Sequence, residues 1–207
     1  MIRNVYISTD NEEKITKLIS FLKKNNKYIS NIEHLENELV LIQEDVTKYE
    51  QLFDYKPIFK QFANDIRTDL SFLIVNDGIF EHIEKFAKTF LDNTYCNVYD
   101  ASSLIYYCFV TNQYDDIIEE FYSYFSKLDD ELLESIYTYL DNNLNGQKTS
   151  KDLFLHRNTL NYRLNKFCFR TGIDVRITQS ASLIHSYRIR HRNRFIKNYE
   201  SEHFYIY

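Results

Sequence analysis

The sequence predicts an α+β protein in two parts, a small βαββαβ domain of the ferredoxin-like type followed by an all-helical helix-turn-helix domain. Two observations support this fold class. In the first half, short runs rich in Val, Ile, Tyr and Phe are interleaved with segments that repeat apolar residues every three or four positions. From about residue 115 onward, helical spacing dominates. Interleaved strands and helices are typical of a sheet covered by helices.

The first element is a strand, and the second is an amphipathic helix. Residues 4–8 alternate like a short strand, and Asp10-Asn11-Glu12-Glu13 fits a capping box at the start of a helix. The apolar positions of this helix are Ile15, Leu18, Ile19 and Leu22.

Residues 27–43 are compatible with two structures. The first is a pair of strands, 27–35 and 38–43, joined by a turn at Glu36-Asn37. The second is one helix that uses Ile29, Ile32, Leu35, Leu39 and Ile42 as its apolar face. The hairpin is favoured because Val, Ile and Tyr suit strands.

The rest of the predicted sheet domain follows in order. Pro57 suits the first turn of a helix that runs to about Thr68, and residues 72–75 form a buried strand. A turn at Asp77-Gly78 precedes a helix over 79–91, and 95–99 form one more strand. This order is the split βαβ pattern, for which we expect helices on one side of the sheet.

A helix with an aromatic stripe is predicted to start at Asp115 and to end near Leu128. Acidic residues at its N-terminus favour the helix. The stripe indicates core or a dimer contact more than a platform for stacking bases; its members are Ile117, Ile118, Phe121, Tyr122 and Phe125.

Residues 153–164 are the most informative segment, because they join a short helix to a second helix with separate apolar and polar faces. Leu160, Leu164 and Phe167 form one stripe, which with Leu153 makes the predicted core of a helix-turn-helix. The opposite side carries Asn158, Asn161, Tyr162, Asn165 and Lys166. An amide-rich, weakly basic face suits the base edges of a major groove.

The stretch from Asp130 to Arg176 closely resembles the C-terminal helix-turn-helix of the PucR/CdaR family of bacterial transcription regulators. The family's opening helix corresponds to residues 131–143 and its short second helix to 148–153. The string His-Arg-Asn-Thr-Leu-x-Tyr-Arg-Leu runs unbroken from His156 to Leu164, and 171–174 continue in the family manner. The alternative is an ordinary helical hairpin with a solvated Arg/Asn face. The resemblance implies a sequence-specific DNA-binding transcription regulator.

The resemblance also bears on the first half of the chain. Family members commonly carry a degenerate domain similar in fold to diguanylate cyclases (GGDEF-like) but inactive, and residues 4–110 look like a shortened, divergent copy. The turn Glu36-Asn37 lacks the Gly-Gly-(Asp/Glu)-Glu-Phe string of a working cyclase. We therefore expect a regulatory or dimerisation domain at 1–112, a connecting aromatic helix at 113–128, the DNA-binding domain at 129–195 and a tail at 196–207.

The recognition helix should enter the groove through its N-terminal half. We expect Asn158, Asn161 and Tyr162 to contact base edges. Arg157 and Arg163 could equally well make contacts within the domain instead of contacting DNA. Ser150 should let the two helices approach closely. The predicted phosphate contacts are Gln147, Lys148, Arg157, Thr159, Arg163, Lys166, Arg188, Arg190 and Arg192.

Two features depart from the family pattern. Phe169 lies on the polar side of the recognition helix, so something outside that helix should cover it. The final helix reads Tyr-Arg-Ile-Arg-His-Arg-Asn-Arg over 187–194, where relatives usually continue with aliphatic residues. It is either a solvated basic face or, the favoured interpretation, a source of added phosphate contacts. The tail 195–207 is too apolar to lie free in water.

Charge supports a polyanion partner at one end of the chain. Residues 145–194 hold eleven lysines and arginines and two aspartates, although the whole chain carries a net charge of −5. Such asymmetry indicates a DNA-binding end on an acidic protein. We expect a homodimer on double-stranded DNA, with the aromatic helix and the tail as its interface.

Other classes find little support. The three scattered cysteines suit packing and reduced thiols in the cytoplasm, and no apolar run is long enough to span a bilayer. The six histidines are dispersed, and no catalytic motif is present, so we expect no enzyme, no metal and no cofactor. The alternatives to a DNA-binding regulator are a non-catalytic protein-interaction module and an RNA-binding module.

Overall fold

The computed structural model describes residues 1–9, 11–35, 38–47, 53–64 and 70–189. The chain divides into two compact units, Met1–Lys127 and Leu128–Tyr207. The aromatic helix over 115–125 belongs to the first unit.

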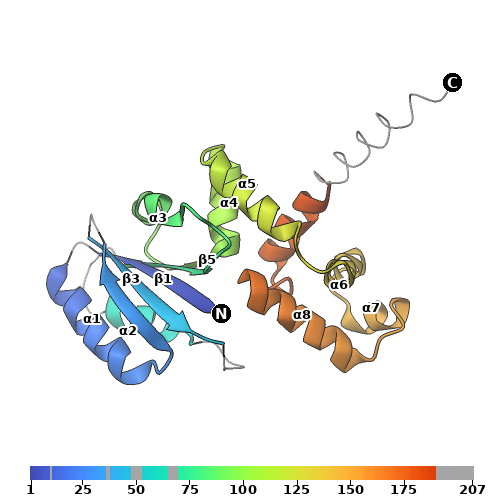
Figure 1. The fold of residues 1–207 in the computed structure, drawn as a ribbon, viewed down its shortest axis with the longest axis horizontal. Helices are drawn as coiled ribbons and strands as arrows, with labels where there is room; N and C mark the ends of the chain where they lie inside the picture. Colours follow the sequence, from blue (N-terminus) through green and yellow to red (C-terminus); the bar gives the residue numbers. More distant parts are fainter. Residues whose placement is uncertain (10, 36–37, 48–52, 65–69, 190–207) are drawn as a thin grey trace. The chain divides into compact units, whose positions relative to one another are not determined.

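The first unit is built on a five-stranded sheet (Figure 1). The strand order is β2-β3-β1-β4-β5, in which β1 is antiparallel to both β3 and β4, and β5 is parallel to β4. The first four strands have the order of the predicted split βαβ pattern, and β5 extends it at the edge. The strands are β1 (Ile2–Ser8), β2 (Ile29–His34), β3 (Leu39–Asp45), β4 (Ser71–Asn76) and β5 (Val98–Asp100).

The predicted hairpin is confirmed, and the alternative of one helix over this segment is wrong. Strands β2 and β3 pair in antiparallel fashion, with Ile32 opposite Ile42. The turn predicted at Glu36-Asn37 lies outside the described residues. Residue 38, just after it, has a positive φ of 60°.

Within its described residues the first unit also contains five helices, and their ends follow local sequence. The Asn11 side chain caps α1 by accepting a hydrogen bond from the Lys14 N–H at 3.0 Å, whereas Asp10 of the predicted capping box lies outside the described residues. Pro57 is the second residue of α2, in the first turn as predicted. The helices are α1 (Glu12–Asn25), α2 (Lys56–Asn64), α3 (Ile83–Asp92), α4 (Ala101–Thr111) and α5 (Asp115–Phe125).

Helices cover both faces of the sheet, so the prediction of helices on one side is wrong. Val5 and Ile7 pack into one core with Leu18 and other α1 residues. Tyr6, between them, faces the opposite side and is equally buried, and α3 packs on β1 and β4 there (Figure 1). A strand that is buried on both faces needs apolar residues at consecutive positions, which Val5, Tyr6 and Ile7 supply.

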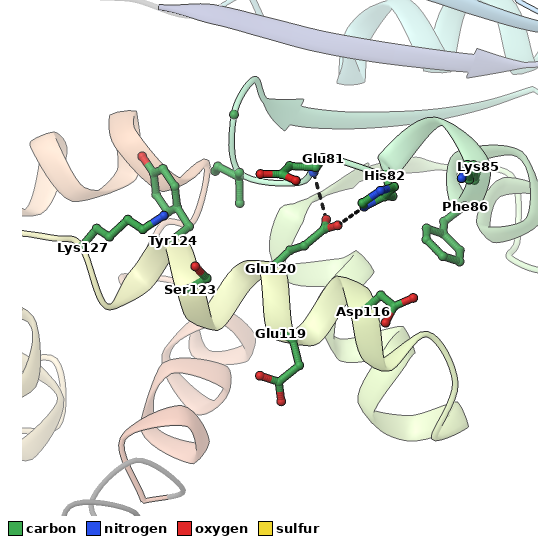
Figure 2. Close-up of a pocket in the computed structure, with 12 residues that line it drawn as sticks. Glu81, His82, Lys85, Phe86, Asp116, Glu119, Glu120, Ser123, Tyr124 and Lys127 are labelled. Atoms are coloured by element: carbon green, nitrogen blue, oxygen red, sulfur yellow. Dashed lines mark hydrogen bonds and ion pairs between the residues drawn. The ribbon is translucent and has the colours of Figure 1, made fainter.

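Helix α3 begins four residues later than predicted. Gly78 turns the chain with a positive φ of 76°, and Ile79 and Phe80 are buried without being helical. The Glu120 carboxylate of α5 holds the segment that follows, because it accepts a hydrogen bond from the Glu81 N–H at 2.9 Å and contacts His82 Nδ1 at 2.5 Å. These residues line an open hollow of about 660 Å³ between α3 and α5 (Figure 2).

The aromatic stripe of α5 is core. Phe121 and Phe125 are 1% and 0% exposed, and Tyr122 packs against Phe109 of α4 with ring centroids 6.4 Å apart. These side chains are buried, which confirms that the stripe is core; that α5 contributes to a dimer interface stays a prediction.

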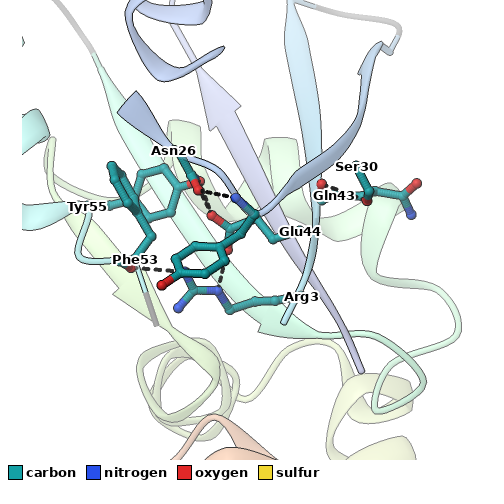
Figure 3. Close-up of polar contacts among 8 residues, drawn as sticks. Arg3, Asn26, Ser30, Gln43, Glu44, Phe53 and Tyr55 are labelled. Atoms are coloured by element: carbon teal, nitrogen blue, oxygen red, sulfur yellow. Dashed lines mark hydrogen bonds and ion pairs between the residues drawn. The ribbon is translucent and has the colours of Figure 1, made fainter. Parts of the chain in front are cut away.

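A buried polar network holds the chain around residues 53–55 to the end of the sheet (Figure 3). The Glu44 carboxylate, 0% exposed, pairs with Arg3 Nε at 2.5 Å and accepts hydrogen bonds from the Tyr55 hydroxyl at 2.6 Å and from Asn26 Nδ2 at 2.5 Å. Arg3 Nη2 also donates to the Phe53 carbonyl at 2.9 Å. Burial and then the neighbouring Glu44 carboxylate raise the pKa of Tyr55 above its usual range, so its hydroxyl stays a donor.

The cysteines differ in their surroundings. Cys108 is fully buried, and burial raises the pKa of its thiol to about 11, as suits a packing residue. Cys168 is half-buried. Cys96 is exposed, so the prediction that it is a packing residue is wrong.

Candidate nucleic-acid interface

The second unit contains the helices predicted for the helix-turn-helix. They are α6 (Asp130–Asp141), α7 (Gly146–Asp152) and α8 (Arg157–Thr171), followed by a helix over 178–189. The apolar stripe of α8 faces inward as predicted, with Leu160, Leu164 and Phe167 at most 3% exposed. Leu153, at the end of α7, is half-buried. Ser150 is buried, as the predicted close approach of the helices requires.

The link between α6 and α7 is fixed by an asparagine that the periodicity did not indicate. Asn142, 7% exposed, follows α6 directly. Its side-chain amide donates to Asp152 at 2.8 Å and to the Thr149 hydroxyl at 3.4 Å, so the end of α6 is tied to α7. Because the Asn142 amide is buried, its two hydrogen bonds fix the position of the short helix.

The start of α8 is set by His156. Its Nδ1 accepts a hydrogen bond from the Asn158 N–H at 3.2 Å, which makes it the N-cap of the recognition helix. In this geometry Nδ1 is the acceptor, so the ring proton lies on Nε2. The first residue of the recognised string is therefore a helix cap, a role that its place before a helix could have suggested.

The three predicted base-reading residues share the outer surface of the first half of α8. Asn158 and Asn161 are exposed, and Tyr162 is 66% exposed. No described residue forms a hydrogen bond or ion pair with the side chain of Asn161 or Tyr162. Thr159 is also exposed. The structure thus brings two amides and a phenol together without internal partners.

Three of the predicted phosphate contacts are engaged inside the domain. Arg163 braces α6, because Nη1 donates to the Ser135 hydroxyl at 3.0 Å and Nη2 pairs with Glu131 at 2.7 Å. Lys166 pairs with Asp129 at 2.9 Å. Arg188 Nη1 contacts both Asp141 carboxylate oxygens, at 2.6 and 2.7 Å, and its guanidinium lies 4.8 Å from the Tyr137 ring.

Asp129, just before α6, forms ion pairs with two cationic side chains. Lys166 Nζ and Arg170 Nη1 each lie 2.9 Å from its Oδ2. The hydrogen bond from Lys166 is the main reason that the pKa of Asp129 falls below its usual range. The carboxylate therefore stays charged at neutral pH and keeps both side chains paired.

Other cations of the domain have no internal partner in the described part of the chain: Lys148 and Lys151 on α7, and Arg157 at the start of α8. All three are exposed and lie near the base-reading surface in the chain. Sequence reasoning missed Lys151. Gln147 is exposed. The backbone N–H of Lys148 donates to the Asn145 side chain, the N-cap of α7, at 3.0 Å. Lys148 can therefore offer a phosphate its side-chain ammonium but not its backbone N–H. Arg190 and Arg192 lie outside the described residues.

Phe169 is half-buried, in keeping with the expectation that something outside α8 covers it. Among the described residues, no group of three or more His, Cys, Asp or Glu side chains is placed to hold a metal ion. In the same ranges, no helix combines the length and the apolar character needed to cross a membrane.

Replacing Asp129 with asparagine is expected to strengthen binding to DNA of any sequence. The substitution removes the carboxylate that pairs with Lys166, and one added phosphate contact steepens the dependence of log K on log salt concentration by about 0.9. Titration of a random-sequence duplex at several salt concentrations measures this slope. Asp174→Asn, which removes the carboxylate beside Arg176 instead, is the matched control. An unchanged slope for Asp129→Asn would contradict the prediction.

Part of the second unit matches a known family of domains. Residues 132–186 match the PucR C-terminal helix-turn-helix domain. Over 44 residues the chain is 48% identical to the uncharacterized protein YxkF of Bacillus subtilis (strain 168), a stretch that makes up 21% of this chain and 15% of YxkF. A solved structure, a regulator of polyketide synthase expression from Bifidobacterium adolescentis, aligns over 93% of this chain and 81% of its own at 14% identity and a TM-score of 0.43. Residues 132–186 therefore form a helix-turn-helix domain of the PucR C-terminal type.

Proposed function

We propose that this protein is a cytoplasmic regulator that recognises a specific sequence of double-stranded DNA through α8. The observation that carries the proposal is the exposed surface formed by Asn158, Asn161 and Tyr162. An asparagine can make two hydrogen bonds to adenine, and a tyrosine can contact a thymine methyl or a phosphate.

The unpaired cations support the same orientation of the domain on DNA. Lys148, Lys151 and Arg157 precede the base-reading residues in the chain, on α7 and the first turn of α8. In helix-turn-helix proteins the recognition helix enters the groove while the preceding helix meets the backbone. The three cations would therefore bind phosphates, and Arg163 would hold α8 on α6.

The rival within nucleic-acid binding is RNA. Readers of RNA sequence need exposed aromatic platforms or loops for splayed bases, whereas the aromatic stripe of α5 is buried. Titration of the protein's own promoter duplex against the matching single-stranded RNA, at fixed salt concentration, separates the two. Preference for the duplex over both the RNA and a scrambled duplex supports the proposal. Preference for the RNA would overturn it.

We also propose that the active form is a homodimer, because one recognition helix covers too little DNA to be selective and helix-turn-helix proteins usually pair across half-sites one helical turn apart. The helix α5, whose stripe is buried, and the tail 195–207, which lies outside the described residues, stay the predicted interface. A regulatory or dimerisation role for the first unit rests on the family resemblance.

Light scattering at micromolar concentration is expected to show a dimer, at least on a duplex with an inverted repeat. Deletion of residues 195–207 tests whether the tail forms the interface. The control is the full chain with Phe121→Leu, a conservative change within the core that should leave the oligomeric state unchanged. A monomer both free and on the inverted repeat would contradict the dimer.

A further inference from the structure

The turn between α7 and α8 carries an aromatic side chain that does not pack against its own domain. Phe154 is 97% exposed and adopts a positive φ of 54°. Its N–H donates to the Lys151 carbonyl at 3.1 Å, and the next N–H, of Leu155, donates to the Ser150 carbonyl at 2.8 Å. These two bonds form a Schellman motif that ends α7, in which Phe154 stands at the position where glycine is preferred.

Folding does not account for this phenylalanine. A side chain at positive φ strains the backbone, which glycine would avoid. The ring also gains almost no burial in return, since nearly all of its surface faces solvent. Both effects favour glycine, so the ring is best explained by a contact outside the chain.

The place of Phe154 points to the partner. It lies two residues before the His156 cap and four before Asn158, directly ahead of the end of α8 that would enter the groove. Lys151 and Arg157, both without a partner in the described ranges, stand on either side of it in the chain. An apolar ring between two cations suits the major groove of DNA, which has phosphates along its edges and apolar methyl groups inside it.

We propose that Phe154 is a specificity-determining residue that packs on the C5-methyl group of a thymine at the edge of the half-site. This inference rests on the proposed DNA-binding function. In the major groove the edges of the bases present hydrogen-bond donors and acceptors, and the thymine methyl is the apolar group that they offer. Phe154 therefore adds a requirement for thymine beside the bases read by Asn158 and Asn161.

The test uses the full chain and the promoter duplex, with each thymine in turn replaced by deoxyuridine, which lacks only the methyl group. Wild type should lose about fourfold in affinity at one position, the value of one buried methyl group. Phe154→Gly should bind the unmodified duplex about fourfold more weakly than wild type and should lose nothing further at that position. Its melting temperature should equal or exceed that of wild type, which excludes unfolding as the cause.

Two further variants make the outcomes distinct. Tyr95→Ala removes an equally exposed ring, 93% exposed, from the first unit and should bind as wild type does. Asn158→Ala reports on the proposed function itself. If Asn158→Ala loses selectivity while Phe154→Gly binds like wild type, or if Phe154→Gly is as sensitive to deoxyuridine as wild type, the thymine contact alone is wrong. If wild type does not distinguish the promoter from a scrambled duplex, the DNA-reading function and the contact both fail.

Discussion

Replacing Glu44 with glutamine is expected to lower the free energy of unfolding of the first unit by about 3–5 kcal/mol, because it leaves the Arg3 charge buried without its counter-ion. The Tyr55 hydroxyl and the Asn26 amide would also lose a charged acceptor. Urea unfolding followed by circular dichroism measures the change.

The control for this prediction is Glu13→Gln. Glu13 also pairs with a cation at 2.5 Å, Lys17, but both side chains are largely exposed, so solvent already screens the pair. We expect its unfolding midpoint to match that of wild type. If Glu44→Gln unfolded at the same urea concentration as Glu13→Gln, the buried network would not stabilise the unit.

The triple variant Asn158→Ala, Asn161→Ala, Tyr162→Ala is expected to lose discrimination between the promoter and a scrambled duplex. Each lost base contact should remove about 1–3 kcal/mol of discrimination, while the phosphate contacts, which do not depend on sequence, remain. Competition binding with labelled promoter duplex measures the ratio of the two affinities. The fold should persist, because the three side chains are exposed.

A matched triple variant removes two exposed asparagines and one exposed tyrosine from the first unit, at Asn25, Asn93 and Tyr106. It should select the promoter as wild type does. Wild-type selectivity in the α8 variant would mean that the chain recognises its target elsewhere, and would favour a protein-interaction role for the helix-turn-helix.

The sheet could be predicted because strand and helix periodicities differ. The β-branched residues of 27–43 favoured the hairpin, alternation located β1, and a short continuous apolar run located β4. The coverage of both faces was missed, although the unbroken run Val5-Tyr6-Ile7 indicated it. The late start of α3 could not be predicted, because buried Ile79 and Phe80 continue the helical spacing while the chain there is held by Glu120, which lies about forty residues further on.

For the candidate site, the helical spacing predicted which residues of α8 face inward and which face outward. It could not show which cations are free. The partners of Arg163 and Lys166 lie 28 to 37 residues earlier, on the loop before α6 and on α6 itself, so tertiary packing decides the pairing. The local charge excess therefore overstated the number of cations available to phosphates.

The most direct test of the central claim, that α8 reads DNA sequence, is selection of bound duplexes from a randomised pool at physiological salt concentration, with wild type and the α8 triple variant in parallel. Wild type should enrich one motif, with half-sites whose centres lie about 10–10.5 base pairs apart, and the variant should not. Recovery of unenriched, random sequences by wild type, or of the same motif by both proteins, would contradict the account.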